Sequence, residues 1–378
     1  MPQGSVQEMP EKVNDRFEEP VYVTRAFMPP FEEYMELMRG VWDRGYVTNH
    51  GPLVQEFERA LGERFGLPGS VFIVNGTIAL HLAIRALELK GDVITTAFSH
   101  PVTTTSIMWE GCTPVFVDVD PGTFCIDPAR IEERITPRTT GIVATHVYGI
   151  PCDVEAIADI ARRYGLKVLY DGAHAFGTTL NGRSILEHGD VSTTSYHATK
   201  IFHTVEGGSM HAGDPDLQRR LVLMRTMGQW GEEFFIPGMN AKNSEMHAAM
   251  GVANLKYYDA IMAARRSQWE YYHELLQGGP LGLARVPEGI GYNHAYFPVV
   301  FPSSEVLEHA RRVLNAGNVF PRRYFRPACT QLPYVSRQGE CPIAEGMADT
   351  VMCLPLFHDL DRSTAERIVE MLLGALKG

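Results

Sequence analysis

The sequence predicts an α/β fold: a mostly parallel, seven-stranded sheet sandwiched by helices, with a smaller α+β unit at the C-terminal end. The first supporting observation is that short apolar runs alternate with helix-like periodicity between residues 70 and 213. The second is that this alternation ends after Pro280, where the apolar runs become shorter. From these changes we predict a loose leader over residues 1–20, a large unit over residues 21–275 and a small C-terminal unit over residues 276–378.

Two helices are predicted before the sheet region. Apolar residues recur at helical spacing from Tyr34 to Trp42, which predicts an amphipathic helix that packs this face, Trp42 included, against the protein. The polar segment 46–52 interrupts the pattern, and a second helix is predicted over residues 53–65.

Seven apolar runs are the predicted strands of the sheet, at residues 71–74, 93–96, 115–119, 142–146, 168–170, 191–196 and 208–211. Three segments between them are predicted helices, at residues 78–89, 103–109 and 154–164. Residues 214–275 are predicted to be largely helical. Ligands of such folds bind at the carboxyl ends of the strands, so polar residues directly after these runs are the candidates for chemistry.

Composition excludes several classes of function. The formal net charge of −11 argues against binding to nucleic acid or to an anionic membrane. No run approaches 18 consecutive apolar residues, and the first twenty residues lack the apolar core of a signal peptide. The six cysteines occur singly, with no CxxC pair, as is typical of buried thiols in a reducing compartment, so we expect a cytoplasmic protein. The histidines do not show HExxH spacing, and no metal site is predicted.

The candidate chemistry follows two neighbouring predicted strands. Asp171 ends the run 168–170, and Lys200 lies shortly after the run 191–196. A lysine that can form a Schiff base with an aldehyde, beside a carboxylate that keeps a ring nitrogen protonated, is what pyridoxal 5'-phosphate requires. The alternative is structural: an aspartate after a strand often caps a turn, and a lysine there is usually solvated.

The residues around this pair resemble a known family. The segments Asp171-Gly-Ala-His174-Ala-Phe-Gly and Ser195-Tyr-His-Ala-Thr-Lys200, followed by Glu206-Gly-Gly, closely resemble the DegT/DnrJ/EryC1/StrS family of sugar-nucleotide aminotransferases. Similar segments extend from about residue 21 to residue 360. The resemblance implies the fold type I, aspartate aminotransferase-like architecture of pyridoxal phosphate enzymes, with pyridoxal 5'-phosphate as the cofactor.

The resemblance also implies roles for individual residues. Lys200 binds the cofactor aldehyde and then serves as general base and acid, while Asp171 pairs with the ring nitrogen. Gly76 and Thr77 form a turn after a predicted strand that opens a helix, the arrangement that binds phosphate, and Ser195 matches the family's phosphate-contacting serine.

Three further cofactor contacts are expected from the resemblance. His174 matches the position of a glutamine or histidine near the ring oxygen, although a buried structural histidine is the alternative. His100 stands where the family usually has an aromatic residue that stacks on the ring, and Phe98 is the competing candidate for this contact. Asn240 matches an asparagine that reaches the phosphate of the neighbouring subunit, which implies a homodimer with a shared active site.

Substrate contacts are expected at six positions, which are Thr48, Asn49, His197, Arg322, Arg323 and Tyr324. For Thr48 and Asn49 a simple turn between helices is the alternative. Guanidinium groups suit a diphosphate or a carboxylate, although adjacent arginines can equally form a solvated strand edge. Arg326 departs from the aromatic residue that the family usually has at this position.

The resulting hypothesis is transamination of an NDP-linked keto-deoxyhexose, favouring dTDP-4-keto-6-deoxyglucose at C4, with L-glutamate as the donor. The product would enter O-antigen, lipopolysaccharide or another deoxyamino-sugar pathway. The alternatives are amination at C3 and a noncatalytic regulatory protein that retains the fold. A 3-dehydratase of the same family is disfavoured because such enzymes have histidine in place of Lys200. A Rossmann dehydrogenase is excluded because no predicted strand is followed by GxGxxG.

Overall fold

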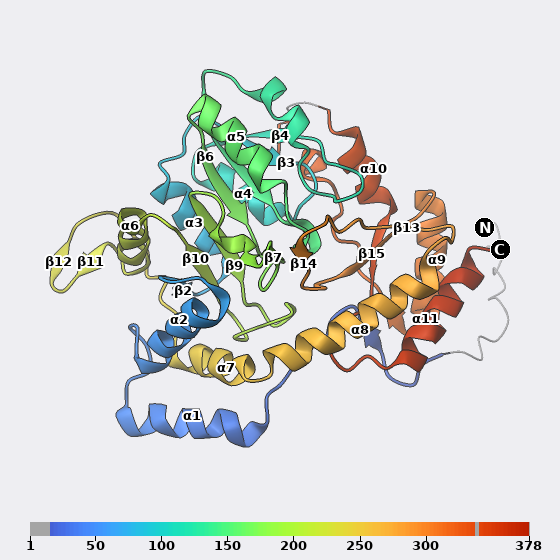
Figure 1. Ribbon diagram of the computed structural model, residues 1–378, viewed down its shortest axis with the longest axis horizontal. Helices are drawn as coiled ribbons and strands as arrows, with labels where there is room; N and C mark the ends of the chain where they lie inside the picture. Colours follow the sequence, from blue (N-terminus) through green and yellow to red (C-terminus); the bar gives the residue numbers. More distant parts are fainter. Residues whose placement is uncertain (1–15, 337–339, 378) are drawn as a thin grey trace, which may run out of the picture.

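A computed structural model describes residues 16–336 and 340–377, so most of the predicted leader lies outside the described residues. Its centre is a seven-stranded sheet (Figure 1), which confirms the predicted fold class. In spatial order the strands are β2 (Val71–Ile73), β10 (Gly208–His211), β9 (Val191–Ser195), β6 (Lys167–Asp171), β5 (Thr139–Thr145), β3 (Asp92–Thr96) and β4 (Thr113–Val117). All pairings are parallel except the two made by β10, and each strand overlaps one of the seven predicted runs.

Helices cover both faces of the sheet because the strand side chains alternate between two apolar cores. Val143 and Leu169 belong to one core, which includes α3 (Gly76–Ala86) and α6 (Pro215–Arg225). Their sequence neighbours Ile142 and Val168 belong to the other core. That second core is covered by α2 (Pro52–Phe65), α5 (Val154–Tyr164) and α7 (Glu245–Leu255). The short helix α4 (Pro101–Trp109) lies beside α3 at the end of β3.

The segment predicted as largely helical contains a hairpin as well. Between α6 and α7 lie β11 (Gln229–Trp230) and β12 (Glu233–Phe234), which project from the body (Figure 1). Gly228 and Gly231, on either side of β11, have positive φ angles, which glycine adopts without strain. The long helix α8 (Tyr258–Leu276) then leads away from the large sheet.

The C-terminal region has a separate apolar core that includes Phe297, Leu314 and Ile368. It is built from β13 (Gly282–Leu283), β15 (Phe297–Val300) and β17 (Val351–Leu354) with α9 (Ser304–Ala316) and α11 (Arg362–Ala375), while α10 (Pro342–Thr350) precedes β17. Helix α8 joins the two cores, since Tyr258 packs in the large one and Tyr272 in this one. The boundary predicted at residue 275 stays a prediction.

The N-terminal segment packs against the C-terminal core. Strand β1 (Val21–Tyr22) pairs in parallel with β16 (Val319–Phe320), and the Phe17 side chain is buried in the same cluster. Helix α1 (Phe31–Arg44) lies at the other end of the molecule (Figure 1) and buries Met38 and Val41. In the described ranges 16–336 and 340–377, no helix is both long and apolar enough to cross a membrane.

Candidate active site

A cavity of about 460 Å³ lies at the carboxyl ends of β6 and β9 and at the N-termini of α3 and α4. This is the position that an open parallel sheet predicts for a ligand site. Ten of the fourteen predicted site residues line it: Gly76, Thr77, His100, Asp171, His174, Ser195, His197, Lys200, Arg322 and Tyr324. The four that do not line it are Thr48, Asn49, Asn240 and Arg323.

Asp171 is the last residue of β6 and is 5% exposed. Its Oδ2 accepts a hydrogen bond of 2.6 Å from the Thr103 hydroxyl, and its Oδ1 accepts one of 3.0 Å from the backbone N–H of Ala173. Each carboxylate oxygen therefore has one protein donor, and the side chain still lines the cavity. Such a carboxylate is oriented by the protein and has capacity to accept from a ligand.

Lys200 lies in the loop after β9, where its backbone N–H donates to the carbonyl of His197 at 2.8 Å. Burial lowers the pKa of the Lys200 amine to about 8, and the nearby Asp171 carboxylate opposes this shift only in part. Within the part of the chain that the structure describes, the amine forms no ion pair. A lysine with a depressed pKa in a cavity is suited to act as a nucleophile or a base near neutral pH.

The N-terminus of α3 forms the opposite end of the cavity. Asn75 caps this helix by accepting from the N–H of Ile78 at 2.9 Å. A Cβ on Gly76 would lie 3.1 Å from the Cβ of Ser195, and a Cβ on Gly208 would lie 2.8 Å from the backbone nitrogen of Gly76. Glycine thus permits two strands and a helix end to meet around a space lined by Thr77 and Ser195. Helix N-termini with nearby hydroxyl groups bind phosphate.

His174 is buried between the cavity and the core. Its Nδ1 accepts from the backbone N–H of Tyr148 at 3.2 Å, and its ring lies nearly parallel to that of Phe325, with centroids 5.6 Å apart. Burial, together with the positive charge of Lys200, holds the pKa of His174 well below its ordinary value. The imidazole is therefore neutral, with Nε2–H available as a donor.

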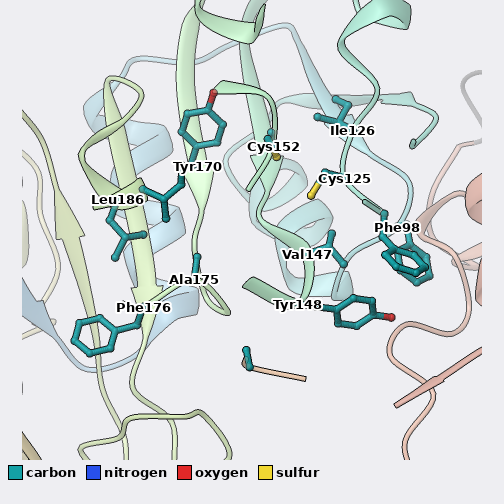
Figure 2. Packing of buried hydrophobic residues seen from close by; sticks show 14 of the residues in the cluster. Phe98, Cys125, Ile126, Val147, Tyr148, Cys152, Tyr170, Ala175, Phe176 and Leu186 are labelled. Atoms are coloured by element: carbon teal, nitrogen blue, oxygen red, sulfur yellow. The ribbon is translucent and has the colours of Figure 1, made fainter. Parts of the chain in front are cut away.

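The structure distinguishes the two candidates for the residue that faces the cofactor ring. His100 lines the cavity and caps α4, since its Nδ1 accepts from the N–H of Val102 at 3.3 Å. Phe98 is 0% exposed and packs edge-on against Tyr148 in the core (Figure 2). Only His100 is thus in contact with the cavity.

The predicted arginines occupy different environments. Arg322 lines the cavity, and its guanidinium carbon lies 5.6 Å from the centroid of the Tyr324 ring. Arg323 lies outside the cavity, where its guanidinium pairs with Glu308 at 2.5 Å and donates to the carbonyl oxygens of Ala348 and Asp349. Both Nη groups of Arg323 are therefore used within the fold.

The remaining predicted residues lie on the surface. Asn240 is exposed, and its side-chain oxygen accepts from the Lys242 amine at 2.6 Å. Thr48 and Asn49 belong to the turn before α2, where Asn49 has a positive φ of 62°. None of the three contacts the cavity of its own chain.

Sequence reasoning missed several residues of the site. Tyr296 precedes β15, and Phe325 follows the predicted Tyr324; both line the cavity from the C-terminal region. Thr103, which bonds Asp171, was missed because it is one of three consecutive threonines in a predicted helix. The sequence contains no spacing signal for any of these contacts.

The donor set fits pyridoxal 5'-phosphate. An oriented buried carboxylate, a lysine amine with a lowered pKa and a helix N-terminus with two hydroxyl groups surround one cavity. They match the ring nitrogen, the aldehyde and the phosphate of this cofactor. Over residues 16–336 and 340–377, no group of three or more His, Cys, Asp or Glu side chains is arranged to hold a metal ion.

Comparisons with known proteins agree with the family that the sequence resembles. The DegT/DnrJ/EryC1/StrS aminotransferase family model matches residues 31–373. A dTDP-4-amino-4,6-dideoxy-D-glucose transaminase of Shigella dysenteriae is 39% identical over 94% of this chain and 99% of its own length. A UDP-N-acetyl-3-dehydro-α-D-glucosamine 3-aminotransferase of Acidithiobacillus ferrooxidans is 33% identical over 95% of this chain and 98% of its own length.

A solved structure shows the same fold. The crystal structure of DesI in the presence of its TDP-sugar product superposes with a TM-score of 0.91 and 30% identity, covering 96% of this chain and 95% of that chain. The cofactor of these aminotransferases is pyridoxal 5'-phosphate. With its fold, its cavity and the family model in agreement over nearly the whole sequence, the chain belongs to the DegT/DnrJ/EryC1/StrS aminotransferase family.

Proposed function

We propose that this protein transfers an amino group from L-glutamate to C4 of dTDP-4-keto-6-deoxyglucose. The observation that carries the proposal is the meeting of Lys200, Asp171 and the N-terminus of α3 in one cavity at the carboxyl edge of the sheet. The name of the Shigella relative, at 39% identity, supports C4 and a dTDP-linked sugar.

The proposed roles follow from the geometry. Pyridoxal 5'-phosphate, when bound, supplies an electron-withdrawing ring that stabilises negative charge on the carbon that loses a proton. Lys200 is the proposed base, because a pKa of about 8 leaves part of the amine neutral at pH 7. Asp171 is proposed to face the ring nitrogen, and His174 to donate to the ring oxygen. The first turn of α3 and Ser195 are proposed to bind the phosphate.

Substrate recognition is proposed to depend on Arg322. Its guanidinium lines the cavity and forms no ion pair among the described residues, so its donors can bind the diphosphate of the sugar nucleotide or a carboxylate of the donor. Tyr324 and His197 line the same cavity and are proposed to contact the sugar. For Arg323 the internal bonds to Glu308 and two carbonyl groups favour a structural role instead.

The proposal includes an assembly and a place in metabolism. Asn240 is exposed and outside its own cavity, which supports the expectation that it serves the active site of a second copy in a homodimer. Thr48 and Asn49 stay predicted substrate contacts. We further propose a cytoplasmic reaction whose amino sugar enters O-antigen and lipopolysaccharide biosynthesis.

Amination at C3 is the second candidate, favoured by the 33% identical relative that is named as a 3-aminotransferase.

The test that separates the two candidates is to incubate the protein with pyridoxal phosphate, glutamate and dTDP-4-keto-6-deoxyglucose, and in parallel with pyridoxal phosphate, glutamate and a 3-keto sugar nucleotide. We expect 2-oxoglutarate to form in the first reaction, with a product that carries nitrogen at C4 by NMR. Turnover of the 3-keto sugar alone would overturn the proposal in favour of C3, and no 2-oxoglutarate in either reaction would support the regulatory alternative.

A further inference from the structure

The first turn of α4 contains three consecutive threonines with different hydrogen bonds. The Thr103 hydroxyl donates to Asp171 Oδ2 at 2.6 Å. The Thr105 hydroxyl donates to the carbonyl of Val102 at 3.2 Å, the usual bond of a helical threonine to its own helix. The Thr104 hydroxyl is buried and lies beside the Cys329 thiol, with which it interacts, and not beside Asp171. Among the three, Thr103 alone is directed at the active-site carboxylate.

We propose that Thr103 is a positioning residue for Asp171, which fixes the carboxylate in the orientation that the cofactor ring nitrogen requires. The inference rests on the proposed function, since it assigns Asp171 to that nitrogen. Thr103 does not line the cavity, so it acts through Asp171 and not by contact with a ligand.

The Asp171 carboxylate accepts hydrogen bonds from two groups, a backbone N–H and a side-chain hydroxyl, and only the hydroxyl can be removed by a substitution. The Ala173 N–H belongs to the backbone just after β6 and donates to Oδ1 at 3.0 Å. The Thr103 hydroxyl comes from a different element, α4, and donates to Oδ2. Because each oxygen has its own donor, the plane of the carboxylate cannot rotate without loss of a hydrogen bond. Thr103 supplies the half of this restraint that a side-chain substitution can remove.

The Thr103 side chain is itself held firmly. It is 0% exposed, and β-branching restricts its χ1 angle in a helix. Its backbone N–H donates to the carbonyl of His100 at 3.1 Å, while the His100 ring caps the same turn. The N-terminal end of α4 therefore lies beside the Asp171 carboxylate.

The arrangement predicts a graded response to substitution. In Thr103→Val the shape is kept and the donor is lost, so Asp171 Oδ2 loses the one hydrogen-bond donor that it has among the described residues. Removal of a hydrogen bond to a charged group, or to a residue that orients a ligand, typically lowers affinity or a rate constant by about 10- to 100-fold. Thr103→Ser keeps the donor and loses only a methyl group. Thr104→Val makes the same change one residue away, at a hydroxyl that makes no hydrogen bond to Asp171 among the described residues.

The experiment starts from ligand-free wild-type protein and variants, and measures cofactor binding and then the reaction with glutamate. The first measured quantity is the dissociation constant for pyridoxal phosphate, from absorbance titration without any substrate. The second is the rate constant of the reaction with glutamate at saturating cofactor, with the glutamate KM determined separately. We expect Thr103→Val to weaken cofactor binding and to lower the rate constant by about 10- to 100-fold, with a smaller change in KM. We expect Thr103→Ser and Thr104→Val to stay within about threefold of wild type, since both leave a donor to Asp171 in place.

Three results would overturn the positioning role of Thr103. The first is wild-type binding and rate in Thr103→Val. The second is a Thr103→Ser variant as impaired as Thr103→Val, because that result assigns the effect to packing. The third is a similar loss in Thr104→Val, which would point to a general effect of changes in α4. If the wild-type protein binds no pyridoxal phosphate, the proposed function itself fails, and the role of Thr103 fails with it.

Discussion

Among single residues, the environment of Lys200 determines how much of its amine is neutral near pH 7. Burial lowers the pKa of its amine from 10.5 to about 8. A lower pKa means that the neutral, reactive amine increases as the pH rises through 8, to about one tenth of the molecules at pH 7 against about 0.03% for an ordinary lysine. We therefore expect capture of pyridoxal phosphate by the ligand-free protein to rise with pH around a midpoint near 8. Stopped-flow absorbance between pH 6 and 10 measures the rate of this capture. A midpoint above pH 10 would contradict the buried environment of Lys200.

A second prediction at this scale concerns His100. Its imidazole is the side chain that lines the cavity at the position where an aromatic residue is expected, because Phe98 is confined to the core. A phenyl ring covers more of a cofactor ring than an imidazole does, so His100→Phe is expected to tighten pyridoxal phosphate binding by several-fold. Phe98→Leu is the control, and it is expected to lower stability without a direct effect on the cofactor. Weaker binding by His100→Phe would show that the histidine contributes through its nitrogen atoms instead.

At the scale of elements, one buried carboxylate holds the start of α2 in place. The Glu245 carboxylate, at the start of α7, accepts from the backbone N–H groups of Leu53 and Val54, each at 3.0 Å. A Cβ on Gly51 would lie 2.6 Å from Glu245 Cδ, so the two elements are in close contact. The predicted substrate turn at Thr48 and Asn49 is attached to this cap.

Glu245→Gln tests this contact. The amide keeps the size of the side chain but turns an NH₂ group toward one of the two backbone donors, which loses its acceptor. The free energy of unfolding is expected to fall by about 1–3 kcal/mol. Glu36→Gln, which breaks an exposed ion pair with Arg39, is the matched control and should change it by less than about 0.5 kcal/mol. Urea unfolding of both variants measures the difference, and equal losses would contradict the role of Glu245.

The sequence predicted those elements whose pattern is regular. The seven strands of the sheet were predictable because their apolar runs alternate with helical periods. The hairpin of β11 and β12 was missed, since two-residue exposed strands have no apolar pattern. The prediction that Trp42 packs with the inward face of α1 is wrong for the single chain, where Trp42 is 70% exposed. It follows Val41 by one residue, which places it about 100° further around the helix.

The residues of the site also differ in whether local sequence patterns could predict them. Asp171 and Lys200 follow strands of one sheet, so the sequence could predict that they meet. Thr103, the partner of Asp171, comes from α4, and Tyr296 and Phe325 come from the C-terminal region and pack into the large core, so these contacts depend on how elements distant in sequence pack together. Local patterns carry no information about such packing. Arg322 and Arg323 are adjacent in sequence, yet only the structure shows that one lines the cavity and the other pairs with Glu308.

For the whole molecule, we predict that two chains share each active site. Asn240 is exposed and outside its own cavity, whereas Lys200 lines it. Lys200→Ala and Asn240→Ala should therefore each be impaired as homodimers. After subunit exchange at equal amounts, half of the dimers are mixed and each has one intact site of two, so about a quarter of wild-type activity should return. No recovery after verified exchange would contradict a shared site.

The role of Lys200 is tested by the absorbance spectrum of the protein loaded with pyridoxal phosphate, before and after addition of glutamate. We expect a long-wavelength band for the lysine-bound cofactor, which glutamate converts to the spectrum of the amine form. In Lys200→Ala this band should be absent or unresponsive. A wild-type protein without the band, or a Lys200→Ala variant that responds to glutamate as wild type does, would contradict the assignment of Lys200 and with it the proposed aminotransferase chemistry.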